Sequence, residues 1–302
     1  MLDCPNCGHS VDVTSAPHCS HCNWHAELVD GVPILISELD KSDPILASYF
    51  KNYDQIADDD LSNAILDQRY VKHQVTNMVR YVGDVRGSDV LDIGCGQGML
   101  AKALVARGAK RVVAVDISMA YLRRLVGLRS IVPMLTNAES LPFRNAFDVL
   151  TSTDVMEHVL NVGSFLISVN QSLRMGGKVA IRVPLVENLL AYAAQSGCKY
   201  RFVHLRTFDR KLLVSALESA GFEVVSFNID GFSVQTPQSF WTRGIRRKRV
   251  YNNLSSWLVK YLSDLTIVTT WNPNFASLFM RPQEIVVVGR KISDASAQSS
   301  AA

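Results

Sequence analysis

The 302-residue chain lacks a charge excess of either sign and lacks a long apolar run. Its 31 basic residues nearly balance its 28 acidic ones, for a formal net charge of +3, which argues against nucleic-acid binding by bulk charge alone. No stretch approaches the roughly 20 apolar residues of a membrane helix, so we expect no transmembrane segment. The start, MLDCPNCGHS, has neither a basic nor an apolar leader region, and we therefore expect a cytoplasmic protein.

Cysteine is scarce, with six residues, and four of them form a pattern. Cys4 and Cys7, then Cys19 and Cys22, make two C-x-x-C knuckles separated by 11 residues. Such a pair brings four thiolates within tetrahedral reach and predicts a structural Zn²⁺ site. The alternative, two disulfides, is disfavoured in a reducing cytoplasm. Residues 1–38 are therefore predicted to be a small zinc ribbon.

Residues 39–82 are predicted to be a helical linker or lid. A polar stretch, ELDKSDP, leads into helical periodicity over 45–82, and the acidic run ADDD at 57–60 predicts a break in it. The aromatic residues of SYFKNYDQ, namely Tyr49, Phe50 and Tyr53, either form a lid over a ligand or pack as ordinary core. A lid would serve to exclude water.

From residue 88 the apolar pattern alternates between short strands and amphipathic helices. This alternation predicts an α/β fold with a doubly wound parallel sheet. Strands are expected at 88–94, 111–117, 131–136, 146–154, 176–184, 223–229 and 284–291, and helices at 97–108, 118–128, about 162–174 and 209–222.

The stretch VLDIGCGQGML, residues 90–100, places three glycines where the first strand turns into a helix. A dinucleotide fingerprint needs G-x-G-x-x-G, but Met99 stands where its third glycine would be. Asp116 lies 20 residues after Gly96 and suits the ribose of either a dinucleotide or S-adenosylmethionine (SAM). Asp92 would repel a diphosphate, whereas it suits a cationic, phosphate-free ligand. The loop therefore favours SAM.

Four segments in order strengthen this interpretation: VLDIGCGQG, VVAVDIS, NAESLPFRNAFDVLTSTDVMEHV and LRMGGKVAIRVP. They closely resemble the class I SAM-dependent methyltransferases, and most nearly the type 11 domain that includes the ubiquinone and menaquinone methyltransferases. The resemblance covers about residues 70–225. It implies a Rossmann-like methyltransferase sheet, with the domain at 83–292.

The resemblance also implies a set of SAM-binding residues. Asp92 would orient the amino group, and Asp116 would accept hydrogen bonds from both ribose hydroxyls. The family usually has Asp at position 137, but Asn137 keeps an acceptor for the adenine amino group. Thr153 and its neighbour Asp154 would lie near the sulfonium. The full set is Asp92, Gly94, Cys95, Gly96, Asp116, Ile117, Asn137, Ala138, Glu139 and Thr153.

Candidate catalytic groups follow the fourth strand. In DVMEHV, Glu157 and His158 would act as orienter and base, by resemblance to relatives in which such a pair lines the substrate pocket or is linked to a metal. The alternative is that His158 only caps the helix and closes the SAM pocket. His204, in KYRFVHLRTF, either faces the substrate or packs within its loop.

Two regions bear on the acceptor. The front module resembles Trm112-like zinc ribbons and the zinc module of bacterial ribosomal-RNA guanine methyltransferases, which keeps RNA open as a partner. An insertion at about 230–283 carries tryptophan and tyrosine residues that line a pocket or form a core of their own. Its RGIRRKR run, 243–249, is either a solvated face or a phosphate contact. Residues 293–302 are expected to be a disordered tail.

We therefore expect a cytoplasmic SAM-dependent methyltransferase (EC 2.1.1.-) with structural Zn²⁺. Its expected acceptor is a small or lipid-like metabolite, because apolar and aromatic residues dominate the insertion. The alternatives are an RNA methyltransferase and a non-catalytic scaffold with a SAM fold, and an NAD enzyme is a third. The sequence leaves the methylated atom and the oligomeric state open.

Overall fold

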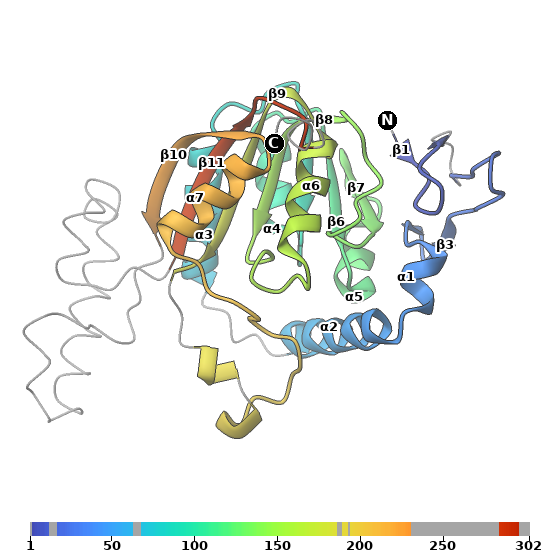
Figure 1. Ribbon diagram of the computed structural model, residues 1–302, viewed down its shortest axis with the longest axis horizontal. Helices are drawn as coiled ribbons and strands as arrows, with labels where there is room; N and C mark the ends of the chain where they lie inside the picture. The colour runs from blue at the N-terminus through green and yellow to red at the C-terminus, as the bar shows by residue number, and fades with distance from the viewer. Residues whose placement is uncertain are drawn as a thin grey trace, which may run out of the picture.

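A computed structural model describes residues 2–11, 17–62, 68–185, 189–192, 194–230 and 284–295 (Figure 1). The insertion expected at 230–283, beyond the end of the strand at Asp230, and the tail after 295 lie outside the described residues. In chain order the elements are β1 Leu2–Asp3, β2 Ser10–Val11, β3 Glu27–Val29, β4 Val32–Ile34, α1 Glu38–Ser42, α2 Pro44–Ser62, α3 Gln68–Val82, β5 Asp89–Ile93, α4 Met99–Ala106, β6 Arg111–Asp116, α5 Met119–Leu122, η1 Arg123–Leu125, β7 Ile131–Leu135, β8 Phe147–Thr153, α6 Val162–Ser172, β9 Leu173–Pro184, η2 Leu189–Tyr192, η3 Ala194–Ser196, α7 Arg210–Ser219, β10 Phe222–Asp230 and β11 Glu284–Lys291.

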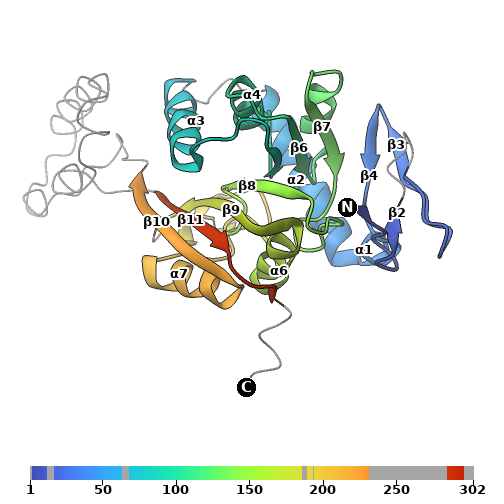
Figure 2. The ribbon, with the colours of Figure 1, turned by 90° about the horizontal axis from the view of Figure 1, so that it is seen from above.

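The main sheet has nine strands in the order β10-β11-β9-β8-β5-β6-β7-β4-β3 (Figure 2). From β9 to β4 the neighbours are parallel, while β11, β10 and β3 are each antiparallel to the strand they follow outward. The chain moves outward from β5 through β6 to β7, then returns to β8 on the other side. This strand order confirms the predicted doubly wound α/β fold. Ligands of such folds bind where the strand order reverses, at the carboxyl ends of the strands.

Helices cover both faces of the sheet. In Figure 2, α3 and α4 lie on one face, and α6 and α7 lie on the other. The strand β5 shows why: all five of its side chains are buried, and its three apolar ones belong to two apolar clusters. Val90 belongs to the cluster beneath α3 and α4, and Leu91 and Ile93 belong to the opposite one. A strand buried on both faces reads as a continuous apolar run.

The front module extends the sheet. Its β3–β4 hairpin turns at Asp30 and Gly31, whose φ values of 51° and 80° are the left-handed pair that a two-residue hairpin turn requires. β4 then pairs with β7, and the Leu35 N–H donates to the Leu135 carbonyl at 2.7 Å. Trp24 and Leu35 share an apolar cluster with the α6 face of the sheet. The described part of the front module, residues 2–11 and 17–38, thus packs directly against the larger domain.

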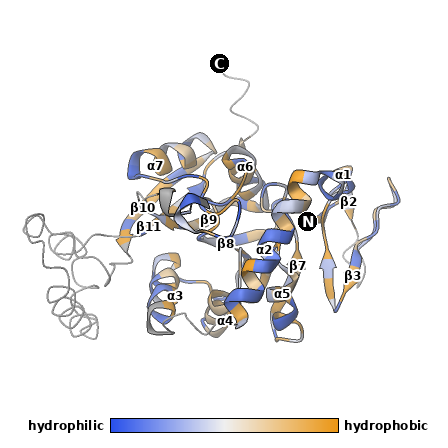
Figure 3. Ribbon diagram, turned by 90° about the horizontal axis from the view of Figure 1, so that it is seen from below, coloured by the Kyte–Doolittle hydropathy of each residue, from blue (hydrophilic) through white to orange (hydrophobic). Residues whose placement is uncertain are grey.

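The helix α2 differs from expectation. It runs unbroken through residues 57–60, so the predicted break there is wrong. The carboxylates are accommodated because partners outside the helix bind them: Lys199 and Tyr200 donate to Asp59, while Gln97 and Tyr121 donate to Asp60. Figure 3 shows α2 carrying both hydrophilic and hydrophobic residues, as suits a helix with one covered face. Among the described residues, no helix is long and apolar enough to span a membrane.

Candidate active site

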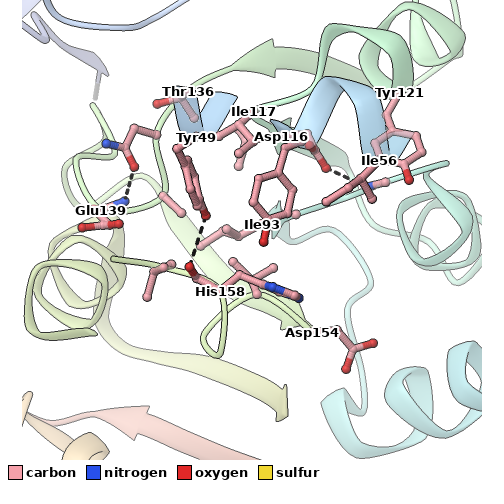
Figure 4. Close-up of a pocket in the computed structure, with 18 residues that line it drawn as sticks. Tyr49, Ile56, Ile93, Asp116, Ile117, Tyr121, Thr136, Glu139, Asp154 and His158 are labelled. Atoms are coloured by element: carbon pink, nitrogen blue, oxygen red, sulfur yellow. Dashed lines mark hydrogen bonds between the residues drawn. The ribbon is translucent and has the colours of Figure 1, made fainter. Parts of the chain in front are cut away.

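A cavity of about 330 Å³ lies at the carboxyl ends of the central strands, beneath α2 (Figure 4). The strand ends and α2 both contribute to its wall: Ile93, Asp116, Thr136, Asp154, Tyr49, Tyr53 and Ile56. Of the three aromatic residues that were candidates for a lid, Tyr49 and Tyr53 line the cavity, whereas Phe50 does not. The cavity occupies the reversal point of the sheet.

The glycine turn fits tightly against its neighbours. Gly94 has φ +66°, and a Cβ there would lie 2.2 Å from a methyl group of Val155. Gly98 has φ +70°, and its Cβ would lie 2.4 Å from a methyl group of Leu125. Gly96, at φ +47°, has nothing within 4 Å and borders the cavity. Two of these glycines are therefore needed for close packing, and the third keeps the ligand face open.

Asp116 ends β6 with its carboxylate fixed at the cavity. One oxygen accepts the Gly96 N–H at 2.9 Å (Figure 4), and the other accepts the Ser118 N–H at 3.0 Å. Each carboxylate oxygen retains a lone pair, since it carries two. Burial raises the pKa of Asp116 above its ordinary value. The group is thus oriented to accept two further hydrogen bonds side by side.

Asp92 lies behind the glycine turn, 1% exposed, and does not line the cavity. Its Oδ1 accepts the Thr151 hydroxyl at 2.7 Å, while Oδ2 is buried without a hydrogen-bond partner among the described residues. Burial raises the pKa of Asp92 to about 7. A buried carboxylate with an unused oxygen is a costly arrangement that a nearby cation would relieve.

The residues after β7 form the next part of the wall. Asn137 Oδ1 accepts the Glu139 N–H at 3.0 Å. Both oxygens of Glu139 accept backbone N–H groups of the turn after β8, from Leu160 at 2.7 Å and Asn161 at 2.9 Å. Glu139 therefore ties the cavity wall to the turn that carries His158.

Arg206 holds the same turn from the other side. Its guanidinium donates to the carbonyl groups of Met156, Val159 and Leu160. The sequence prediction missed this residue. The signal available was an arginine between Leu205 and the buried Phe208, where a partly buried cation needs several acceptors.

The side chain of His158 is 15% exposed, and its protonation is constrained. Its Nδ1 accepts the backbone N–H of His204 at 3.3 Å, so Nε2 carries the proton in the neutral ring. Burial, followed by the neighbouring His204, lowers the pKa of His158 to about 3. Figure 4 also shows the Tyr49 hydroxyl donating to the His158 carbonyl. In this arrangement His158 presents no free acceptor nitrogen to a substrate.

His158 stands in a cluster with the two other predicted catalytic residues. Its Nε2 lies 3.8 Å from Oε1 of the fully buried Glu157, and its ring meets that of His204 edge-on with centroids 4.6 Å apart. One ligand atom from each of the three lies within 4.8 Å of the others, close enough to share a metal ion. His204 stacks in turn on Tyr192, with ring centroids 4.1 Å apart.

A segment from 199 to 204 closes this side against α2. Asn52 exchanges two hydrogen bonds with the backbone of Arg201, and the Tyr53 hydroxyl donates to the Phe202 carbonyl. Phe202 and His204 have φ values of 57° and 44°, which bulky residues rarely adopt. Contacts with α2 hold this strained backbone in place.

The predicted site residues divide into two groups. Those lining the cavity are Gly94, Gly96, Asp116, Ile117, Asn137, Ala138, Glu139 and His158. Those outside the lining are Asp92, Cys95, Thr153, Glu157 and His204. The buried Cys95 packs in the apolar cluster beneath α3 and α4, which explains why its side chain turns away from the cavity.

The four cysteines of the front module converge. The Sγ atoms of Cys4 and Cys22, and those of Cys7 and Cys19, lie 3.5 Å apart, and all four lie within 4.8 Å of one another. These distances exclude disulfides, which need about 2.05 Å between sulfur atoms, and suit tetrahedral bonds of about 2.3 Å to one ion. Burial raises the pKa of Cys4 to about 12, so this thiol needs a cation to ionise.

Comparison with known proteins adds three findings. A sequence model described as a methyltransferase domain matches residues 67–227. A tRNA U34 carboxymethyltransferase of Shewanella sp. (strain ANA-3) is 32% identical over 114 residues, which is 35% of this chain and 34% of that protein. The chain therefore matches about a third of the length of this relative.

Two solved structures share the fold. A chain from the complex of the Haloferax volcanii Trm112 methyltransferase activator with a methyltransferase has a TM-score of 0.57 at 16% identity, covering 82% of this chain and 98% of that one. An S-adenosylmethionine-dependent methyltransferase from Mesorhizobium loti has a TM-score of 0.50 at 18% identity, covering 72% and 96%.

Proposed function

Because this chain belongs to the methyltransferase-domain family, we propose that it transfers a methyl group from SAM to a nucleobase of RNA. The observation that carries the donor assignment is the carboxylate of Asp116, fixed by two backbone amides with a lone pair left on each oxygen. Vicinal ribose hydroxyls are two donors at that spacing. The adenosyl part of the donor would extend from there along Ile117 to Asn137 and Ala138.

The charge of the cavity supports a cationic donor. Its described lining holds the carboxylates of Asp116, Glu139 and Asp154, and no lysine or arginine. The buried Oδ2 of Asp92 adds a further site for a positive group. These charges favour an ammonium and a sulfonium, and disfavour the diphosphate of NAD. They also favour a methyl group over the carboxymethyl group that the Shewanella relative transfers, because a carboxylate would meet like charge here.

The acceptor proposal rests on the relative and on the segment 199–204. The Shewanella relative acts on tRNA. Beside the cavity, cations alternate with rings: Lys199 lies over Tyr200, and Arg201 over Phe202. Stacking rings interleaved with cations are how proteins hold unpaired bases of RNA. The lipid-like acceptor expected from the sequence depended on 230–283, outside the described residues, and the comparisons do not support it.

The chemistry needs alignment more than activation. SAM supplies a methyl group that is already electrophilic, so holding the acceptor in line with it contributes most to the rate. The Tyr49 and Tyr53 side chains line the cavity, where they would exclude water once a ligand is bound. We assign His158 the role of shaping the wall, since its Nδ1 is occupied. Glu157 lies 3.8 Å from His158, and both Glu157 and His204 lie outside the cavity lining, so we assign neither of them a direct contact with the substrate.

For the front module we propose a structural Zn²⁺ held by Cys4, Cys7, Cys19 and Cys22. Four cysteines close the coordination shell, so the ion would contribute folding energy and no open catalytic position. Its fit rests on the convergent sulfur atoms and on the buried Cys4 thiol.

The test is a titration followed by a labelling experiment. Calorimetry with SAM, its demethylated product and NAD is expected to give binding of the first two only. Radiolabelled SAM incubated with RNA, lipid and small-metabolite fractions is then expected to label RNA, and binding to bulk RNA is expected to weaken with salt.

Asp84→Ala serves as the control that keeps both activities, because Asp84 is an exposed carboxylate that pairs with Arg86 and does not line the cavity. Binding of NAD in place of SAM would overturn the donor assignment. SAM binding without label in any fraction would favour a scaffold, and label confined to lipids or metabolites would overturn the RNA proposal.

A further inference from the structure

The front module touches the donor cavity through the short helix α1. Asn6 sits inside the first cysteine knuckle, and its side-chain carbonyl accepts the Glu38 N–H at 2.8 Å. This N–H begins α1, whose N-cap is the Ser37 hydroxyl. The knuckle therefore satisfies one of the helix-start donors that otherwise lack a partner. The placement of α1 depends on the shape of the knuckle.

The other side of α1 holds the cavity wall. Asp40 Oδ2 accepts the Asn137 side-chain N–H at 3.3 Å and the Ser140 hydroxyl at 3.0 Å. Asn137 is 7% exposed and lines the cavity, with its Oδ1 turned to the Glu139 N–H. The two ends of the Asn137 amide are thus fixed by different partners. A carboxylate on α1 decides how this cavity residue is oriented.

The roof of the cavity follows from the same helix. Asp43 ends α1, and its carboxylate accepts the Ile45 N–H at 2.7 Å at the start of α2. Helix α2 then places Tyr49, Tyr53 and Ile56 over the cavity. A shift of α1 would move both the Asn137 wall and this roof, because α1 contacts both.

We propose that the four-cysteine module, when it holds its metal, is a positioning element for the donor, and that metal occupancy sets donor affinity through Asn6 and Asp40. This inference rests on the proposed binding of SAM. Without a cation the knuckle loses the centre that draws its sulfur atoms together, and Asn6 loses its place under α1. Asp40 and Asn137 then lose their fixed positions, and the affinity of the cavity for the donor falls.

The first test compares metal-loaded and chelator-treated full-length protein by calorimetry with the demethylated product of SAM. Affinity is expected to fall at least about fivefold on metal removal, the factor that loss of one net hydrogen bond gives. Reloading with Zn²⁺ or Co²⁺ is expected to restore it. Equal affinity with and without metal would overturn the inference, whereas no binding in either state would instead overturn the proposed function.

Variants that keep the metal separate positioning from folding. Asn6→Ala and Asp40→Ala are each expected to weaken product binding about fivefold, while the visible Co²⁺ spectrum and the circular dichroism stay unchanged. Asn23→Gly, beside the second knuckle at φ 57°, and Glu38→Ala, which keeps the backbone N–H, are the matched controls. Wild-type affinity in both test variants would reject the path through α1.

An exchange of charges is the sharpest test. Asn137→Asp would set a second carboxylate against Asp40, and affinity is expected to fall. Adding Asp40→Asn restores a donor and an acceptor across the same contact, so the double variant is expected to recover most of the loss. If the double variant binds as weakly as the sum of the two single effects, Asp40 does not act through Asn137, and the inference fails.

Discussion

The two halves of the cavity, to which we assign the donor and the acceptor, are built by different means. On the donor side, Asp92 and Asp116 lie at the ends of adjacent parallel strands, and the glycine turn packs against β6 through backbone bonds. On the acceptor side, the His158 turn belongs to no strand or helix. Glu139 and Arg206 hold it from two sides through its own backbone groups.

This difference shows how each half of the cavity fixes the positions of its side chains. A strand end inherits its position from the sheet, so a donor-side residue needs few partners to be placed. A turn has no such frame, so the acceptor side needs a clamp of side chains and tolerates strained backbone at Phe202 and His204. We therefore expect donor-side substitutions to affect affinity or stability, and acceptor-side substitutions to affect turnover.

The largest effect is expected for Asp116→Ala. This change removes the acceptor of the Gly96 and Ser118 amides as well as that of the donor hydroxyls. Hydrogen bonds to a charged group are worth about 1.5–3 kcal/mol each, so product affinity is expected to fall about 100-fold or more. Calorimetry measures it, with Asp84→Ala as the control. A loss below tenfold would mean that the ribose lies elsewhere.

A stability contrast within the glycine turn comes next. Gly94→Ala places a Cβ 2.2 Å from Val155 at φ +66°, whereas Gly96→Ala meets nothing within 4 Å. Left-handed strain and overpacking together should cost Gly94→Ala about 2–4 kcal/mol in the free energy of unfolding. Gly96→Ala should cost only about 1 kcal/mol, from backbone strain alone. Urea unfolding compares them, and equal losses would refute this account of the turn.

Arg206→Ala tests the acceptor side. Three carbonyl groups of the His158 turn lose their donor, so the turn should shift away from its working position. We expect kcat to fall about tenfold, in line with the sensitivity of rate to small misplacements, while product affinity changes less than about twofold. Arg210→Ala is the control, because Arg210 is an exposed arginine at the start of α7 that contacts Phe227 and does not line the cavity. A fall in affinity as large as the fall in kcat would erase the contrast between the two halves.

A pH dependence of donor binding is the smallest expected effect. Burial raises the pKa of Asp92 to about 7 in the free protein, and a bound cation favours the ionised form. Binding then releases a proton below pH 7, so affinity should rise about fourfold from pH 6.5 to pH 8 and change little above that. Asp92→Asn should flatten the profile. Calorimetry in buffers of different ionisation enthalpy counts the released protons.

The same shift has a consequence for the ligand-free fold. Asp92 holds its proton in the folded state up to about pH 7, while an unfolded aspartate releases it near 3.9. The protonated native state is therefore favoured at low pH, and this contribution to stability is lost as pH rises from about 4 to 7. Urea unfolding of the wild type against Asp92→Asn would detect it, and a wild-type curve parallel to that of the variant would contradict it.

The sequence predicted the sheet and the donor side because these depend on local patterns. The apolar run of β5, the glycines and Asp116 all lie within a few residues of a strand end, so their placement follows from the alternation of elements. The acceptor side depends on contacts across long separations, such as Asn52 with Arg201 and Glu139 with Leu160. The spacing of these residues in the sequence does not predict that they are in contact.

The predicted break at 57–60 failed for the same reason. Four residues of ADDD look unfavourable in an isolated helix, yet Asp59 and Asp60 find donors on segments 37 to 141 residues away in the chain. The junction of the front module with β7 also escaped prediction, because a three-residue strand such as β4 has no periodicity to detect. A sequence pattern predicts a strand or a helix, but it does not predict which other segment of the chain pairs with it or packs against it.

The β3–β4 hairpin has a practical consequence of its own. A chain trimmed to begin at residue 39 would keep the glycine turn and the His158 clamp, but the Leu135 carbonyl would lose the amide that now covers it. β7 would then be an exposed edge strand, and the unpaired N–H and C=O groups of an exposed edge can pair with a strand of another molecule. The trimmed protein is therefore expected to aggregate during expression, because the hairpin protects the edge of the sheet although it carries none of the four cysteines.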